Sequence, residues 1–173
     1  TTMRVAVFLP PKADSLGAGA TLAGLVFLSG LTCTEENVTI KSGVQRYAAE
    51  AGLAFIAPDT SPRGEGVAND ERYNMGQGAG FYVDATQAPW APHFQMESYI
   101  TKDLIDAVTT ALPIDRERLG VSGHSMGGHG ALTLALRHLG LFKSLSAFAP
   151  IAAPMEVEWG QVCLGGYLGD DQS

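Results

Sequence analysis

The chain has 173 residues, of which 46% are hydrophobic and 17% charged, and its formal net charge is −7. A domain usually holds ~100–200 residues, so we expect a single domain over residues 1–173 with enough chain to bury a core. The acidic balance argues against a nucleic-acid partner or an anionic membrane surface, because both need a basic face. The sequence has no run of ~18 apolar residues that could cross a membrane and no signal-peptide pattern.

Short runs rich in β-branched and aromatic residues predict strands. These runs are residues 4–9, 22–28, 53–57, 118–122 and 144–149. The second run shows no alternation of polar and apolar residues, which is typical of a strand buried on both faces.

Helical spacing of apolar residues predicts helices over 40–51, 96–112 and 125–138. Residues 60–95 have no clear period, and a loop of this length in a compact domain is usually functional. The tail, 151–173, has no pattern that predicts an element. Strands that alternate with helices indicate an α/β fold, in which helices cover both faces of a mostly parallel sheet.

Residues 123–127, Gly-His-Ser-Met-Gly, match the G-x-S-x-G pattern between a predicted strand and a predicted helix. At such a sharp turn the neighbours two residues away must lack side chains that would clash. The pattern predicts Ser125 as a nucleophile at a helix N-terminus, where the dipole helps to bind a developing oxyanion. The backbone N–H of Met126, directly after the nucleophile, is then one oxyanion donor. A glycine-rich turn without chemistry is the alternative.

The second oxyanion N–H in such sites comes from the loop after an earlier strand, and we assign it to Leu31 in Ser29-Gly30-Leu31. An ordinary strand-to-helix turn is the alternative. Cys33 follows and is expected near the site. Cys33 and Cys163 are too few for a disulfide framework and lack metal-ligand spacing, so we expect two thiols in a reducing cytoplasm and no metal.

The four histidines are assigned no part in proton transfer. His124 adjoins Ser125, but adjacent side chains diverge at a sharp turn, so we expect it to support the turn beside the site. His129 is expected to pack or hydrogen-bond beside the helix start, and His138 to lie at the helix C-terminus as a partner of the dipole. His93 is expected on the surface, with a pocket lining as the alternative.

Together these segments resemble the S-formylglutathione hydrolases of the esterase D family. The matching stretches are residues 28–37, 58–64, 80–86, 122–131 and 166–169. The resemblance implies an α/β-hydrolase fold, a Ser-Asp-His triad and no cofactor. It also implies hydrolysis of a small-molecule glutathione thioester, S-formylglutathione, to glutathione and formate in formaldehyde detoxification, with side activity on small esters.

The triad of this fold follows the order Ser, Asp, His along the chain. Only 48 residues follow Ser125, and the later histidines, His129 and His138, precede all of the later acids. Those acids are Glu156, Glu158, Asp170 and Asp171. No complete triad in this order can be built, so we expect an internal fragment of a longer chain, incomplete at both ends and inactive by itself.

Two other functions stay open for this sequence. One is a carboxylesterase of acetyl or feruloyl type on the same fold. The other is a hydrolase-like scaffold that keeps the serine without catalysis. The oligomeric state is also left open, with a homodimer among the alternatives.

Overall fold

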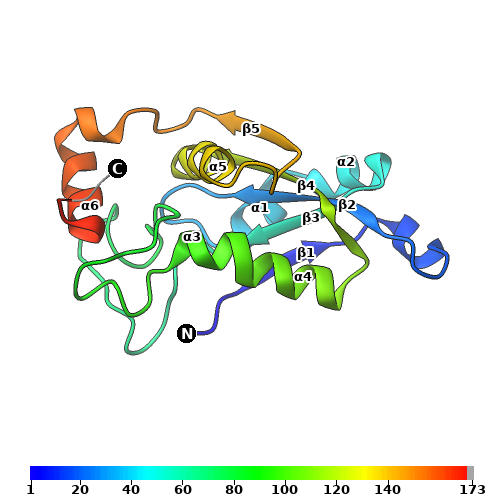
Figure 1. The fold of residues 1–173 in the computed structure, drawn as a ribbon, viewed down its shortest axis with the longest axis horizontal. Coiled ribbons are helices and arrows are strands. Elements are labelled where there is room, and N and C mark those ends of the chain that lie inside the picture. The colour runs from blue at the N-terminus through cyan, green and yellow to red at the C-terminus, as the bar shows by residue number, and fades with distance from the viewer. Residues whose placement is uncertain (171–173) are drawn as a thin grey trace.

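The computed structural model describes residues 1–170. Its sheet has the strand order β1-β3-β2-β4-β5, and Figure 1 shows the strands with helices packed around them. The strands are β1 Val5–Phe8, β2 Leu22–Leu28, β3 Ala54–Pro58, β4 Ile114–His124 and β5 Ser144–Phe148. β1 runs antiparallel to β3, and the other neighbouring pairs are parallel. The expected mostly parallel sheet is confirmed.

The helices alternate with the strands along the chain as expected. The α-helices are α1 Glu35–Lys41, α2 Val44–Ala51, α3 Met96–Ser98, α4 Ile105–Ala111, α5 Met126–Arg137 and α6 Glu158–Leu168. Short helical turns are η1 Pro11–Ser15, η2 Tyr99–Leu104 and η3 Pro154–Glu156, of which η2 is a π-helical turn that joins α3 to α4. No helix among residues 1–170 has both the length and the apolar character needed to cross a membrane.

Both faces of the sheet are covered around β2, but the prediction that β2 is buried on both faces holds only in part, because its residues are fully buried on one face and half-buried on the other. Val26 and Leu28 belong to the larger core, together with buried side chains of α4 and α5. Leu25 and Phe27 point the other way and pack around Phe55, together with side chains of α1 and α2. Successive strand residues point to opposite faces, so β1, β2 and β3 each contribute side chains to both cores. The expected covering of both faces by helices is confirmed.

The expected single helix over 40–51 is wrong. The chain forms α1 and α2, which are separated by Gly43 at a left-handed φ of 65°. Thr34 caps α1 with a capping box, so that helix begins well before Ile40. β4 is also longer than the predicted 118–122, because Leu22 pairs with Ile114 across a register shift in the β2–β4 ladder.

Residues 60–95 form no helix or named strand, as predicted, yet they contribute deeply buried side chains to the core. Phe81, Tyr82 and Phe94 are each at most 1% exposed. α6 packs against this long loop through Tyr167, whose ring stacks on Phe94, and Figure 1 shows α6 beside the loop at one end of the molecule. The tail without a predicted element thus contains a docked helix.

Candidate active site

Ser125 lies at a sharp turn between β4 and α5. Its backbone has φ 58° and ψ −119°, a conformation that non-glycine residues rarely adopt. The turn is fixed on both sides, because the Ser125 N–H donates to the Phe148 carbonyl and the Ile151 N–H donates to the Ser125 carbonyl. Strained backbone of this kind costs ~1–3 kcal/mol and persists where the surrounding structure enforces it, often at functional sites.

The two glycines of the 123–127 motif are required by close backbone contacts. A Cβ placed on Gly123 would lie 2.0 Å from the Gly127 carbonyl oxygen. A Cβ on Gly127 would lie 1.9 Å from the carbonyl oxygen of Leu28, at the end of β2. The expectation that side chains at these two positions would clash is therefore correct. The close approach of Gly127 to Leu28 also brings the start of α5 against the end of β2.

The loop after β2 lies directly against Ser125. A Cβ on Gly30 would be 3.2 Å from the Ser125 Cβ and 3.6 Å from its Oγ. Leu31, half-buried, comes next in this loop, and Met126, fully buried, is the first residue of α5. The structure thus brings together the segments of all three residues that sequence reasoning assigned to the nucleophile and the oxyanion donors.

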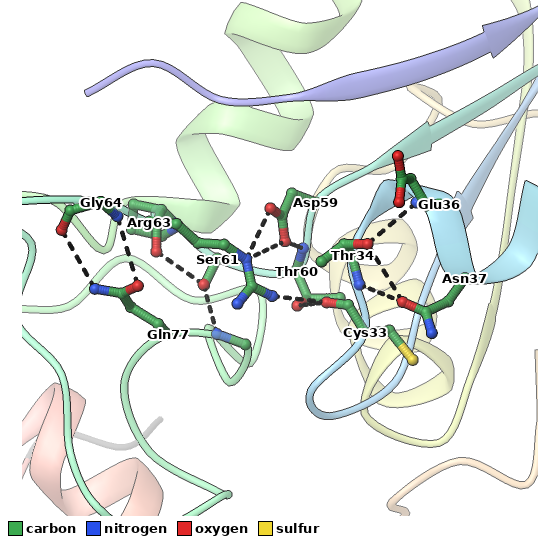
Figure 2. A network of polar contacts seen from close by, with 12 residues as sticks. Cys33, Thr34, Glu36, Asn37, Asp59, Thr60, Ser61, Arg63, Gly64 and Gln77 are labelled. Carbon is green, nitrogen blue, oxygen red and sulfur yellow. Dashed lines mark hydrogen bonds and ion pairs between the residues drawn. The ribbon is translucent and has the colours of Figure 1, made fainter.

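Side chains of the long loop hold the loop 29–34 from one side. The Cys33 carbonyl accepts hydrogen bonds from Thr60 Oγ1 at 2.5 Å and from Arg63 Nη2 at 2.9 Å, as Figure 2 shows. Arg63 Nε also pairs with the buried carboxylate of Asp59 at 2.9 Å. One guanidinium therefore joins the end of β3 to the loop beside Ser125.

A second set of contacts reaches the same loop from further along the chain. The Thr32 N–H donates to the Gly78 carbonyl at 2.8 Å, and Tyr82 Oη donates to the Ser29 carbonyl at 2.8 Å. Sequence reasoning missed the parts played by Arg63 and Tyr82. Their only signal was that both lie in stretches, 58–64 and 80–86, that carried the family resemblance.

Two histidine rings, those of His129 and His138, are hydrogen-bonded to partners other than the Ser125 hydroxyl. His129 Nδ1 lies 2.9 Å from the Ile151 carbonyl, and burial lowers the pKa of this imidazole. His138 Nε2 lies 2.7 Å from Glu97 Oε1, at the C-terminal end of α5. The expected hydrogen bonding of His129 and the expected place of His138 are confirmed.

The other two histidines differ in their surroundings. His93 Nδ1 lies 2.6 Å from Thr1 Oγ1, and the residue lines a cavity of about 210 Å³. The alternative role of His93 as a pocket residue is therefore correct. His124 is exposed beside Ser125, and its backbone continues the β4–β5 ladder opposite Phe148.

Both cysteines are free thiols, as expected. Cys33 is half-buried at the loop beside Ser125, whereas Cys163 is buried in α6, where its thiol donates to the Asn74 carbonyl. Burial raises the pKa of the Cys163 thiol to about 11. Within residues 1–170, no cluster of three or more His, Cys, Asp or Glu side chains is arranged to hold a metal ion.

Known proteins resemble this chain over its whole length. It is 57% identical to the S-formylglutathione hydrolase of Paracoccus denitrificans over 173 residues and 50% identical to that of Mus musculus over 172 residues. These matches cover 100% and 99% of this chain but 61% and 60% of the relatives. The chain therefore spans about 60% of the length of the curated relatives it matches.

A solved structure and a family model agree with these matches. The S-formylglutathione hydrolase of Agrobacterium tumefaciens superposes with a TM-score of 0.93 at 47% identity, over 98% of this chain and 60% of that one. The fold is thus that of the α/β hydrolases, as expected. The model of the esterase family, described as "Putative esterase", matches residues 1–173. The chain belongs to the esterase family.

Proposed function

We propose that the protein to which this chain belongs is a serine hydrolase that cleaves S-formylglutathione to glutathione and formate. One observation carries the proposal: the strained turn at Ser125 lies against the loop at Gly30, which supports Ser125 as the nucleophile and the neighbouring Leu31 and Met126 as the oxyanion donors. The names of the relatives at 57% and 50% identity support the choice of thioester. The free thiols are consistent with the proposed cytoplasmic location.

In the proposed reaction, Ser125 Oγ attacks the thioester carbonyl and forms a C–O bond. The N–H groups of Leu31 and Met126 stabilise the oxyanion, an effect worth on the order of 10²–10³ in kcat per donor. The C–S bond then breaks, and glutathione leaves with the proton taken from the serine. Water attacks the formyl-serine, which releases formate and restores the hydroxyl.

A histidine must take the serine proton, and a carboxylate must orient that histidine. We propose that both come from outside residues 1–173, within a longer chain. The proposal is supported by the engagement of His93, His129 and His138 with other partners. It is also supported by the greater length of the relatives.

The test measures kcat/KM of the full natural protein for S-formylglutathione and for a simple aryl acetate. We expect the thioester to be strongly preferred, whereas a preference for the aryl acetate would favour a general carboxylesterase. Ser125→Ala should lower kcat on the order of 10⁶-fold. A variant that kept a tenth of the activity would lose only ~1.4 kcal/mol of barrier lowering and would refute the nucleophile assignment.

A serine-directed fluorophosphonate separates an enzyme from a scaffold. An activated Ser125 should be labelled rapidly, because the reagent forms a covalent bond to a serine whose proton is removed by a base. Failure to label the folded natural protein would favour the non-catalytic scaffold.

A further inference from the structure

Tyr82 lies in the long loop, with its side chain inside the protein. The residue is 1% exposed, and its hydroxyl donates to the Ser29 carbonyl at 2.8 Å. Burial raises the pKa of this phenol well above its usual value, so the hydroxyl stays protonated and remains a donor. Phe81 and Tyr82 both have positive φ, 49° and 58°, so the backbone is strained where it aims this ring inward.

The same ring also packs against the helix that begins after Ser125. A Cβ placed on Gly130 would lie 2.4 Å from Tyr82 Cδ2, so the ring rests on the backbone of α5. One turn earlier, a Cβ on Gly127 would lie 2.7 Å from the Ser29 carbonyl oxygen. Tyr82 therefore contacts both segments that carry the proposed oxyanion donors. Its hydroxyl bonds to the loop that contains Leu31, and its ring packs against α5, which begins at Met126.

Hydrogen bonds hold the loop on both sides of Leu31, at Ser29 and at residues 32–33. Tyr82 holds the loop at Ser29, and the bonds to Gly78, Thr60 and Arg63 hold it at residues 32–33. Ser29 is 3% exposed, so without the Tyr82 hydroxyl its carbonyl would be buried without this partner. A buried polar group left without a hydrogen bond is costly, and the peptide is expected to shift until it finds one.

We propose that Tyr82 is a positioning residue, which fixes the spacing between the backbone N–H groups of Leu31 and Met126 so that both point at one oxygen. The proposal rests on the proposed function and names a further residue for it. Tyr82 acts through Ser29 and does not touch the substrate. Oxyanion stabilisation depends on donors held in place before the reaction, so a small displacement of Leu31 should slow chemistry more than it weakens binding.

Tyr167 offers a matched control for a substitution of Tyr82. It is also fully buried, and its hydroxyl donates to the Ala79 carbonyl and accepts from the Gly76 N–H, both at 2.8 Å. These partners lie in the long loop on either side of Gly78, so Tyr167 reaches the loop 29–34 only indirectly, through the hydrogen bond from the Thr32 N–H to the Gly78 carbonyl. Replacing either tyrosine by phenylalanine removes one buried hydroxyl and leaves one or two backbone groups unpaired.

The experiment compares Tyr82→Phe with Tyr167→Phe in the full natural protein, with an aryl acetate and S-formylglutathione as substrates. Tyr82→Phe should lower kcat about 10- to 100-fold with KM within about twofold, because a misplacement of ~1 Å can cost 10²-fold. Tyr167→Phe should lower kcat no more than about threefold, because its effect on the loop 29–34 passes only through Gly78, although both variants melt at lower temperature. A 4-aminophenylalanine at position 82 keeps a donor and should restore most of kcat.

Amide hydrogen exchange, followed by mass spectrometry on the peptide 28–34, tests the positioning without activity. Exchange in this peptide should be at least about tenfold faster in Tyr82→Phe than in Tyr167→Phe, when each variant is measured at the same number of degrees below its own melting temperature. If Tyr82→Phe does not fold, 4-methylphenylalanine, which fills the same space without a donor, takes its place.

Two results would overturn the proposal: equal kcat values in the two phenylalanine variants, or unchanged exchange in the peptide 28–34. If the natural protein hydrolyses neither substrate, the proposed function fails. In that case the exchange measurement still decides whether Tyr82 fixes the loop.

Discussion

Gly30 and Ser125 are in contact across two segments that lie 95 residues apart, since a Cβ on Gly30 would come within 3.2 Å of the Ser125 Cβ. Gly30→Ala should therefore push the loop away from Ser125, the proposed nucleophile. The Ser125 backbone is fixed by the bonds to Phe148 and Ile151 and has little room to yield. We expect kcat to fall about tenfold or more, because a shift of a fraction of an ångström would misplace the N–H of Leu31, the proposed oxyanion donor.

The control for this substitution is Gly17→Ala in the full natural protein. A Cβ on Gly17 would meet nothing within 4 Å, so kcat should not change. Steady-state kinetics and a melting curve measure both variants. A Gly30→Ala protein with the kcat of Gly17→Ala would show that the loop does not approach Ser125 this closely during catalysis.

Arg63→Met should destabilise the protein strongly. Asp59, whose side chain is 5% exposed, would lose its ion pair, and the Cys33 carbonyl would lose one donor. Breaking a buried pair costs ~3–5 kcal/mol, and partial exposure of Arg63 reduces this to about 2–3 kcal/mol of unfolding free energy. Arg46→Met is the control, because the Arg46–Glu50 pair is exposed and worth about 0.3–0.5 kcal/mol. Urea unfolding that gave equal losses would contradict the assigned role of Arg63.

Cys33 is expected to make the proposed hydrolase activity of the full natural protein sensitive to thiol reagents. A bulky maleimide on its half-buried thiol would crowd the loop that carries Leu31, whereas Cys163 is buried and its pKa is raised. After treatment with the maleimide, turnover should fall in the natural protein and stay unchanged in Cys33→Ser. Before treatment, Cys33→Ser should have most of the activity of the natural protein. Protection by Cys163→Ser instead would place the reactive thiol in α6.

His129 should make stability depend on pH below neutrality. Burial lowers its pKa in the folded state, whereas the unfolded state titrates near ~6.5. Between these values the unfolded state binds more protons, so this part of the stability is present above pH ~6.5 and is lost as pH falls through the folded pKa. His129→Asn, which keeps a donor for the Ile151 carbonyl, should flatten the dependence of unfolding free energy on pH between about 7 and 5. An unchanged slope would exclude His129 as its source.

Residues 1–173 expressed alone should associate and lack esterase turnover. β5 is the last strand of the sheet order, and its Leu145 and Phe148 are 39% and 57% exposed. An unpaired strand edge with exposed apolar side chains favours edge-to-edge association. Near-UV circular dichroism, light scattering and aryl acetate hydrolysis measure the outcome. A folded monomer with enzyme-like turnover would mean that one of the four histidines of this chain serves as the base.

The sequence determined those features whose causes are local. Residues 22–28 form β2 as predicted, because a continuous apolar run can be stable only when both faces are covered. The turn at Ser125 was predictable because Gly123 and Gly127 remove clashes within one short segment between a strand and a helix.

The tertiary structure decided the features that depend on contacts between distant segments. Ser29 and Tyr82 are 53 residues apart in the sequence and are joined by a hydrogen bond. A contact of this kind produces no periodic pattern in the sequence, so it could not be predicted from the sequence alone. α6 was likewise not predicted, since its glycines and its buried Tyr167 follow no amphipathic pattern and the helix is held by packing against the long loop. Periodicity records which face of an element is buried, whereas the partner that covers the face is chosen only when the whole chain folds.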